Sequence, residues 1–199
     1  MLTVVGMGPA GLQWLIPAAR EAIAAAEALV GGSRHLQQFP DFAGERFALG
    51  ADMPALLAWI EARTGRRVVV LASGDPLFYG IGTRLIAHFG RERVQVIPGI
   101  SAVQYLCARA GIDMNDMWLT SSHGRAVSFD ALAAHRKVAM VTDGRCGPRE
   151  IAAQLMARGK GHRWMVIGEN LAMENERIHW LPVSAVEDEY EMNAVVILD

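Results

Sequence analysis

Short apolar runs alternate with longer segments of helical periodicity along the chain. The runs Leu2–Val5 and Arg67–Ala72 are rich in valine and leucine, which is typical of strands buried on both faces of a parallel sheet. Between them, Asp52–Arg63 carries apolar residues on one helical face and begins with an aspartate suited to cap a helix. The pattern therefore predicts an α/β fold.

The alternation continues to the last residues. Further strands are predicted at Leu29–Val30, Val94–Ile97, Trp118–Thr120, Val138–Val141, Trp164–Ile167, Arg177–Trp180 and Ala194–Leu198. Further helices are predicted at Pro17–Ala28, Tyr79–His88 and Phe129–Ala134, from Pro148 onward, and after the turn Pro98-Gly99-Ile100-Ser101 through Ala110. The pattern breaks around Gly111–Asn115, and the half that follows is richer in strands, some of them antiparallel. We therefore expect two αβα lobes, residues 1–112 and 113–199, with a ligand cleft between them.

Composition narrows the class of protein. The chain has 199 residues, of which 52% are hydrophobic, as is ordinary for a folded domain. No apolar run approaches the roughly 18–20 residues of a membrane span, and the first cationic residue, Arg20, comes too late for a signal peptide. The formal net charge of -2 disfavours a nucleic-acid partner. These features predict a cytoplasmic protein that acts on a small molecule.

Cysteine and cation usage add two expectations. Cys107 and Cys146 are far apart, and neither has a second Cys or a His at metal-ligand spacing, so both are predicted to be reduced structural thiols and no metal site is expected. Only Lys137 and Lys160 are lysines, and the other cations are arginines, whose planar forks suit carboxylate groups. The base composition of the genome is the alternative explanation for the arginines.

A glycine-rich turn follows the first predicted strand. Gly6-x-Gly8-x-x-Gly11 matches the spacing of a dinucleotide-binding loop. However, Val30-Gly31-Gly32-Ser33 stands where that fingerprint expects an acidic residue for the ribose, and Pro9 removes one backbone N–H that would face a phosphate. An NAD(P)-dependent oxidoreductase is therefore kept as an alternative function.

A second turn, from Ser73 to Gly80, follows the strand Arg67–Ala72. Open α/β sheets bind their ligands at the carboxyl ends of the strands, so this position favours a functional role. The structural alternative is that Asp75 caps a helix whose first residue is Pro76, which are the residue types expected at those positions. Both interpretations stay open at this point.

The turn Ser73-Gly74-Asp75-Pro76, with Pro98-Gly99-Ile100-Ser101-Ala102 after the next strand, resembles the tetrapyrrole methylase family. The opening Val5-Gly6-Met7-Gly8-Pro9 agrees with this resemblance. Other stretches resemble the branch of the family that methylates carbon 5 of cobalt-precorrin-7, and these stretches are Gly31-Gly32-Ser33-Arg34-His35-Leu36, Ser121-Ser122-His123-Gly124-Arg125, Glu169-Asn170-Leu171 and Glu176-Arg177-Ile178. The resemblance extends from end to end of the chain.

The resemblance implies a cofactor and a set of site residues. The methyl donor is expected to be S-adenosylmethionine, bound between the lobes largely by backbone groups, with S-adenosylhomocysteine as its product. Motif by motif, the resemblance assigns cofactor binding to Gly74, Asp75, Ser101, Ala102, Thr142, Asn193 and Ala194. It assigns the tetrapyrrole to the first glycine loop, at Gly6, Gly8 and Pro9, where absent side chains would let a wide ring approach the backbone.

Charged side chains complete the candidate site. His123 and Arg125 are the catalytic candidates, in the sense of orienting the substrate, although a lone histidine is more often a surface or satisfied core residue. Arg34 and Arg109 are candidates for binding the acetate and propionate groups of the macrocycle. A solvated surface arginine is the alternative for each of them.

The expected function is methylation of carbon 5 of cobalt-precorrin-7 in cobalamin (vitamin B12) biosynthesis by a homodimeric enzyme. In the two-domain relatives of the oxygen-dependent pathway, a second domain methylates carbon 15 and removes a carboxyl group, so this chemistry is expected to belong to a partner protein. Methylation of the metal-free substrate, an NAD(P)-dependent oxidoreductase and a non-catalytic corrinoid-binding scaffold are the alternatives.

Overall fold

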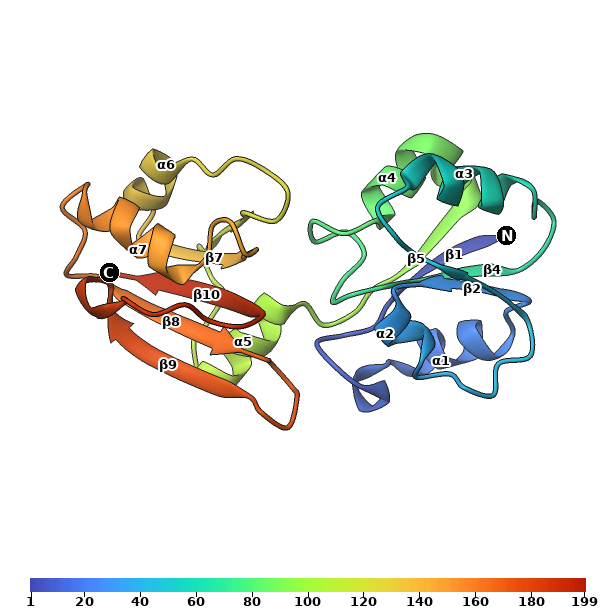
Figure 1. The fold of residues 1–199 in the computed structure, drawn as a ribbon, viewed down its shortest axis with the longest axis horizontal. Helices are drawn as coiled ribbons and strands as arrows, with labels where there is room; N and C mark the ends of the chain where they lie inside the picture. Colours follow the sequence, from blue (N-terminus) through green and yellow to red (C-terminus); the bar gives the residue numbers. More distant parts are fainter. The chain divides into compact units, whose positions relative to one another are not determined.

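The computed structural model describes residues 1–199 and contains two compact units, Met1–Ser101 and Ala102–Asp199, each built around one five-stranded sheet (Figure 1). The expected α/β fold with two sheets is confirmed. The division falls before helix α5 (Ala102–Ala110), whereas the sequence pattern placed it after residue 112. The physical reason is that α5 packs against two strands of the second sheet.

The first unit holds a fully parallel sheet in the order β3-β2-β4-β1-β5. Its strands are β1 (Leu2–Gly6), β2 (Ala28–Gly31), β3 (Glu45–Ala48), β4 (Val68–Ala72) and β5 (Val94–Ile97). Its helices are α1 (Pro17–Ala24), α2 (Ser33–Leu36), α3 (Met53–Glu61) and α4 (Gly82–Phe89), with short 3-10 turns at Leu12–Trp14 and Arg91–Arg93. Helices α1 and α2 lie on one face of this sheet, and α3 and α4 lie on the other (Figure 1).

The central strand β4 explains why the first sheet is covered on both faces. Val68 and Val70 belong to the hydrophobic cluster formed with α3 and α4, while Val69 and Leu71 belong to the cluster formed with α1 and α2. Because successive strand residues point to opposite faces, an uninterrupted apolar run buries itself only between two helical layers. All four side chains are buried, as the sequence predicted.

The second unit holds a mixed sheet in the order β6-β7-β10-β8-β9. Its strands are β6 (Trp118–Ser121), β7 (Lys137–Val141), β8 (Trp164–Glu169), β9 (Arg177–Pro182) and β10 (Asn193–Leu198), and its remaining helices are α6 (Phe129–Ala134), α7 (Pro148–Met156) and a 3-10 turn at Val183–Ala185. Strand β10 runs antiparallel to β7 and β8, and β9 runs antiparallel to β8, so the expectation of antiparallel strands is confirmed. Helices α6 and α7 cover one face of this sheet and α5 the other (Figure 1).

Strand directions in the second sheet bring five strand ends to one edge. Strands β6 and β7 are parallel, and β8 has the same direction because both β7 and β8 are antiparallel to β10. The carboxyl ends of β6, β7 and β8 therefore lie beside the amino ends of β9 and β10.

None of the helices combines the length and the apolar character that a membrane span requires.

Three local predictions differ from the structure. Helix α4 begins at Gly82 and not at Tyr79, whose φ of 55° places it in the left-handed region. Strand β3 and helix α2 were not predicted, because β3 contains a single large apolar residue, Phe47, and α2 is only one turn long. The helix that begins at Pro17 ends at Ala24, and the chain then turns into β2.

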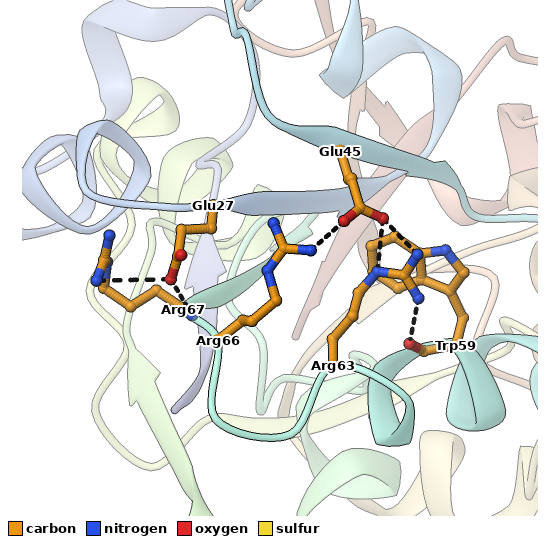
Figure 2. A network of polar contacts seen from close by, with 6 residues as sticks. All are labelled: Glu27, Glu45, Trp59, Arg63, Arg66 and Arg67. Atoms are coloured by element: carbon orange, nitrogen blue, oxygen red, sulfur yellow. Dashed lines mark hydrogen bonds and ion pairs between the residues drawn. The ribbon is translucent and has the colours of Figure 1, made fainter.

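Ion pairs occupy the amino-terminal side of the first sheet (Figure 2). Glu45 at the start of β3 accepts hydrogen bonds from Arg63 and Arg66, which follow α3, and Glu27 accepts one of 2.9 Å from the Arg67 backbone N–H. The hydrogen bonds from Arg63 and then Arg66 lower the pKa of Glu45. These arginines are thus neutralised by neighbouring carboxylates and tie the edge strand β3 to the turn before β4.

Candidate active site

Three glycines interlock at the carboxyl edge of the first sheet. Gly6 ends β1, Gly74 follows β4 and Gly99 follows β5. A Cβ atom on Gly6 would lie 2.7 Å from the Gly74 carbonyl oxygen, and one on Gly99 would lie 2.7 Å from the Gly6 Cα atom. Real Cβ atoms do not approach other heavy atoms this closely, so only glycine allows the three loops to meet.

The first glycine loop folds onto the turn after β4. The Gly74 N–H donates to the Gly8 carbonyl oxygen at 3.0 Å, and the Gly8 N–H donates to the Gly74 carbonyl oxygen at 3.2 Å. Gly8 has a φ of +73°, and a Cβ atom there would lie 2.8 Å from the Trp14 Cβ atom. Local packing therefore explains the glycines at positions 6 and 8. The expected contact of the tetrapyrrole with Gly6, Gly8 and the half-buried Pro9 stays a prediction.

Asp75 connects the two turns that the resemblance assigns to the cofactor. Its Oδ1 atom accepts a hydrogen bond from the Leu77 N–H at 2.8 Å, and its Oδ2 atom accepts one from the Gly99 N–H at 3.1 Å. The carboxylate does not cap a helix, since α4 begins only at Gly82, so the capping interpretation of Asp75 is wrong. Asp75 holds the β4 and β5 loops together.

The motif after β2 contributes a buried histidine to the same edge. The His35 Nε2 atom lies 3.4 Å from the Ser73 hydroxyl oxygen, at the end of β4. Burial, followed by the positive charge of Arg34, lowers the pKa of His35, so its imidazole is neutral at neutral pH. Arg34 itself is exposed on α2.

Thr142 and Asn193 meet at the corresponding edge of the second sheet. The Thr142 hydroxyl lies 3.1 Å from the Asn193 carbonyl oxygen and also within hydrogen-bonding distance of the Asn193 side-chain oxygen. Ala194 follows in β10, is fully buried, and is paired with Val141 on one side and Gly168 on the other. The structure thus brings Thr142, which directly follows β7, together with Asn193 and Ala194, the first two residues of β10.

The Asp143 carboxylate organises the loop that contains the Ser-x-His-Gly-Arg stretch. It accepts hydrogen bonds from the N–H groups of Gly124 at 3.1 Å, Arg145 at 3.0 Å and Cys146 at 3.1 Å. These backbone hydrogen bonds lower the pKa of Asp143, and the bond from the Gly124 N–H has the largest effect. The loop geometry therefore depends on a carboxylate that stays ionised well into the acidic range.

The two catalytic candidates lie on this loop with exposed side chains. The His123 N–H donates to the Ser121 hydroxyl oxygen at 3.0 Å, which fixes the backbone while leaving the imidazole exposed. Arg125 is also exposed, and its N–H donates to the Ser122 carbonyl oxygen at 3.3 Å.

Of the remaining cofactor candidates, Ser101 is buried and Ala102 is half-buried, and the division between the two units falls between these residues.

Arg109 already has a carboxylate partner within the chain. Its Nε atom donates to Glu176 Oε1 at 2.9 Å, and this bond raises the pKa of Arg109. Burial acts to raise the pKa of Glu176, but hydrogen bonds from the Ala172 N–H, Arg109 and Tyr105 outweigh it and lower that pKa. The pair links α5 to the segment before β9. Binding of a substrate carboxylate by Arg109 stays a prediction, in competition with Glu176.

Three organising residues were missed as site residues by the sequence analysis: Asp143, Glu169 and Asn170. Each lies at the end of a strand or within two residues after it, at the carboxyl edge of the second sheet, which is a usable signal. Glu169 and Asn170 also fall in one of the stretches that carry the family resemblance. Each of the three also has a hydrogen-bond partner about twenty residues away, Gly124 for Asp143 and Glu191 for Glu169 and Asn170, so the sequence alone could not show what they hold in place.

A family model matches residues 1–186 of this chain, under the description Tetrapyrrole (Corrin/Porphyrin) Methylases. The match covers the whole of the first unit and most of the second, and it ends before Asn193 and Ala194 in β10. The chain therefore belongs to the tetrapyrrole methylase family.

Curated relatives give the similarity more detail. The chain is 79% identical over 199 residues to Cobalt-precorrin-7 C(5)-methyltransferase of Salmonella typhimurium, covering 100% of this chain and 99% of that protein. It is 33% identical over 181 residues to Precorrin-6Y C(5,15)-methyltransferase [decarboxylating] of Sinorhizobium sp, covering 89% of this chain but 44% of the longer relative. The similarity to the first extends along the whole of both chains.

Solved structures share the fold. The precorrin-6Y methylase of Archaeoglobus fulgidus superposes with a TM-score of 0.77 at 25% identity, covering 100% of this chain and 97% of that one. A uroporphyrin-III C-methyltransferase from Thermus thermophilus, solved with S-adenosylhomocysteine, superposes with a TM-score of 0.80 at 17% identity and covers 100% and 97%. At such identity the second similarity supports the fold alone.

Proposed function

We propose that this chain transfers a methyl group from S-adenosylmethionine to carbon 5 of cobalt-precorrin-7 in cobalamin biosynthesis. The observation that carries the proposal is the 79% identity over the full length to a relative named for that reaction. The site supports it, because Gly74 and Asp75 follow the end of β4, and Thr142 and Asn193 lie where β7 ends and β10 begins. S-adenosylhomocysteine is the corresponding product.

The groups at these strand ends suit the cofactor. S-adenosylmethionine carries an ammonium group and ribose hydroxyls that need acceptors, and each carboxylate or carbonyl oxygen can accept more than one hydrogen bond. Each carboxylate oxygen of Asp75 in the first unit accepts one backbone hydrogen bond, and Thr142 and Asn193 in the second unit present hydroxyl and amide oxygens. We assign cofactor binding to Gly74, Asp75, Ser101, Ala102, Thr142, Asn193 and Ala194.

When bound, the sulfonium of the cofactor supplies an electrophilic methyl group to an electron-rich carbon. The contribution of the protein is to position the substrate and to exclude water, which can account for much of the rate. The interlocked loops at Gly6, Gly74 and Gly99 form a rigid backbone surface that suits this task. We assign substrate binding to Gly6, Gly8, Pro9, Arg34 and Arg109.

His123 and Arg125 are proposed to orient the substrate without transferring a proton. The exposed side chains on an anchored loop support this role, because the backbone is fixed while the imidazole and guanidinium can reach a ligand. A His123→Ala variant is expected to raise the KM for the tetrapyrrole about tenfold, as loss of one good hydrogen bond to a charged group does, with kcat changed much less. Steady-state kinetics would check this, and a fall in kcat at unchanged KM would contradict it.

The proposal also includes the assembly and a partner. We propose a cytoplasmic homodimer, in line with the family resemblance and with C2 dimers being the commonest assembly. Methylation of carbon 15 and the decarboxylation are assigned to another protein, since the Salmonella relative that is 79% identical over its length is named for the carbon 5 reaction alone.

Mass spectrometry of the macrocycle tests the proposed function. The purified protein is incubated with S-adenosylmethionine and either cobalt-precorrin-7 or its metal-free counterpart. One added methyl group on the cobalt form alone is the expected result. Methylation of the metal-free form alone would instead assign the enzyme to the oxygen-dependent pathway. If neither form is methylated, thermal stabilisation by NADP but not by S-adenosylhomocysteine would instead favour the oxidoreductase.

A further inference from the structure

A buried carboxylate with no assigned role lies beside the proposed cofactor residues of the second unit. Glu169 is the last residue of β8 and is only 8% exposed. Its Oε1 atom accepts a hydrogen bond of 2.7 Å from the Glu191 N–H, and its Oε2 atom lies 3.3 Å from His179 Nε2 on β9. Burying a carboxylate is costly unless it is well hydrogen-bonded, so its position calls for a specific explanation.

The neighbouring residue, Asn170, holds the same segment from a second point. Its N–H donates to the Met192 carbonyl oxygen at 2.9 Å, and its side-chain amide donates to the Glu191 carboxylate. Asn170 has a φ of 49°, in the left-handed region that asparagine tolerates better than most residues. The end of β8 therefore binds residues 191 and 192 through both backbone and side chains.

The segment held in this way leads directly to the proposed cofactor residues. The Asn193 side-chain amide donates to the Glu191 carbonyl oxygen at 2.7 Å, which orients the asparagine side chain. The opposite end of that side chain, its oxygen, is the group that meets the Thr142 hydroxyl. Movement of Glu191 would thus reorient the Asn193 side chain and change its contact with the Thr142 hydroxyl.

We propose that Glu169 is a positioning residue for cofactor binding: it fixes Glu191, and through Glu191 the pair Asn193 and Thr142. The inference rests on the proposed function, which assigns Thr142 and Asn193 to the cofactor. Because Glu169 acts through the Glu191 N–H, an acceptor of the same length matters more than the negative charge. This distinguishes positioning from a direct electrostatic contact with the ammonium group of the cofactor.

Two substitutions separate the acceptor from the charge. Glu169→Ala removes the acceptor, and the dissociation constant for S-adenosylhomocysteine, measured by calorimetry, is expected to rise about tenfold. Glu169→Gln keeps an oxygen that can accept from the Glu191 N–H, and its affinity is expected to stay within about threefold of the parent. In the ligand-free protein, hydrogen exchange of residues 187–193 is expected to be faster in Glu169→Ala than in Glu169→Gln.

Glu189→Ala is the matched control, since Glu189 is a highly exposed glutamate that pairs with Arg149 at the surface. Equal affinities for Glu169→Ala and the parent would overturn the inference, as would equally weak binding by the Ala and Gln variants. If Glu169→Ala does not fold, Glu169→Asp, which shortens the same acceptor, must weaken binding more than Glu169→Gln or the inference fails.

A Thr142→Val variant separates this inference from the proposed function. If Thr142→Val leaves the affinity for S-adenosylhomocysteine unchanged, the proposed cofactor assignment in the second unit is wrong. If Thr142→Val weakens binding and Glu169→Ala does not, the cofactor assignment stands and only the positioning role of Glu169 is wrong.

Discussion

A Gly99→Ala variant is expected to lose about 1–3 kcal/mol of unfolding free energy, because the added methyl group is forced into a closely packed region. The new Cβ atom would lie 2.7 Å from the Gly6 Cα atom and would overlap the Gly74 carbonyl oxygen, both of which are backbone and cannot rotate away. The overlap can be relieved only if the loops after β1, β4 and β5 move apart. Since a displacement of about 1 Å can reduce turnover by two orders of magnitude, kcat/KM is expected to fall about 100-fold.

Urea unfolding and steady-state kinetics check both parts of this prediction. Gly50→Ala is the matched control within the same unit, because no heavy atom lies within 4 Å of the position that its Cβ would take and its φ is not in the left-handed region. If the Gly99 and Gly50 variants had the same stability and the same kcat/KM, the proposed interlocking of the loops would be contradicted.

An Asp143→Ala variant is expected to lower kcat/KM by about 10- to 100-fold, through displacement of the loop that carries His123. The substitution leaves the N–H groups of Gly124, Arg145 and Cys146 without their common acceptor. The KM for the tetrapyrrole should rise more than that for S-adenosylmethionine. Asp188→Ala, a change of an exposed aspartate in the same unit, should have no comparable effect.

The pH dependence of this loop follows from the same hydrogen bonds. The pKa of Asp143 is lowered in the folded protein below its ordinary value of 3.8, so the carboxylate stabilises the folded loop fully above that value. The stabilisation is lost as the pH falls through the lower, folded-state pKa. Hydrogen exchange, corrected for intrinsic rates, should therefore show the same protection of Gly124 at pH 5 as at pH 7, and no such protection in Asp143→Ala.

The sequence predicted most of the fold because burial on both faces produces recognisable runs such as that of β4. It misplaced the start of α4 because the residues after Pro76 form a turn held by Asp75, and local propensity does not reveal the Gly99 N–H that shares this carboxylate. It placed the division between the units after α5 because only tertiary packing shows that this helix belongs to the second sheet.

The candidate site was predictable in part for a similar reason. Loops such as Ser73–Asp75 follow evident strands, so their position at a sheet edge could be expected from the sequence. The roles of Asp143 and Glu169 could not be, because both depend on partners about twenty residues away that the fold brings close. The family resemblance was carried by the loops, and the side chains that hold those loops in shape became visible only in three dimensions.

The interlocked glycines also limit how this part of the molecule can evolve. At Gly6 and Gly99, backbone atoms already occupy the space that a side chain would take, so neither position can acquire a new contact with a ligand by simple substitution. A mutational scan should find these two positions almost invariant, whatever substrate is used for selection. Divergence of substrate preference from such a scaffold would have to come from residues with exposed side chains, such as His123 and Arg125.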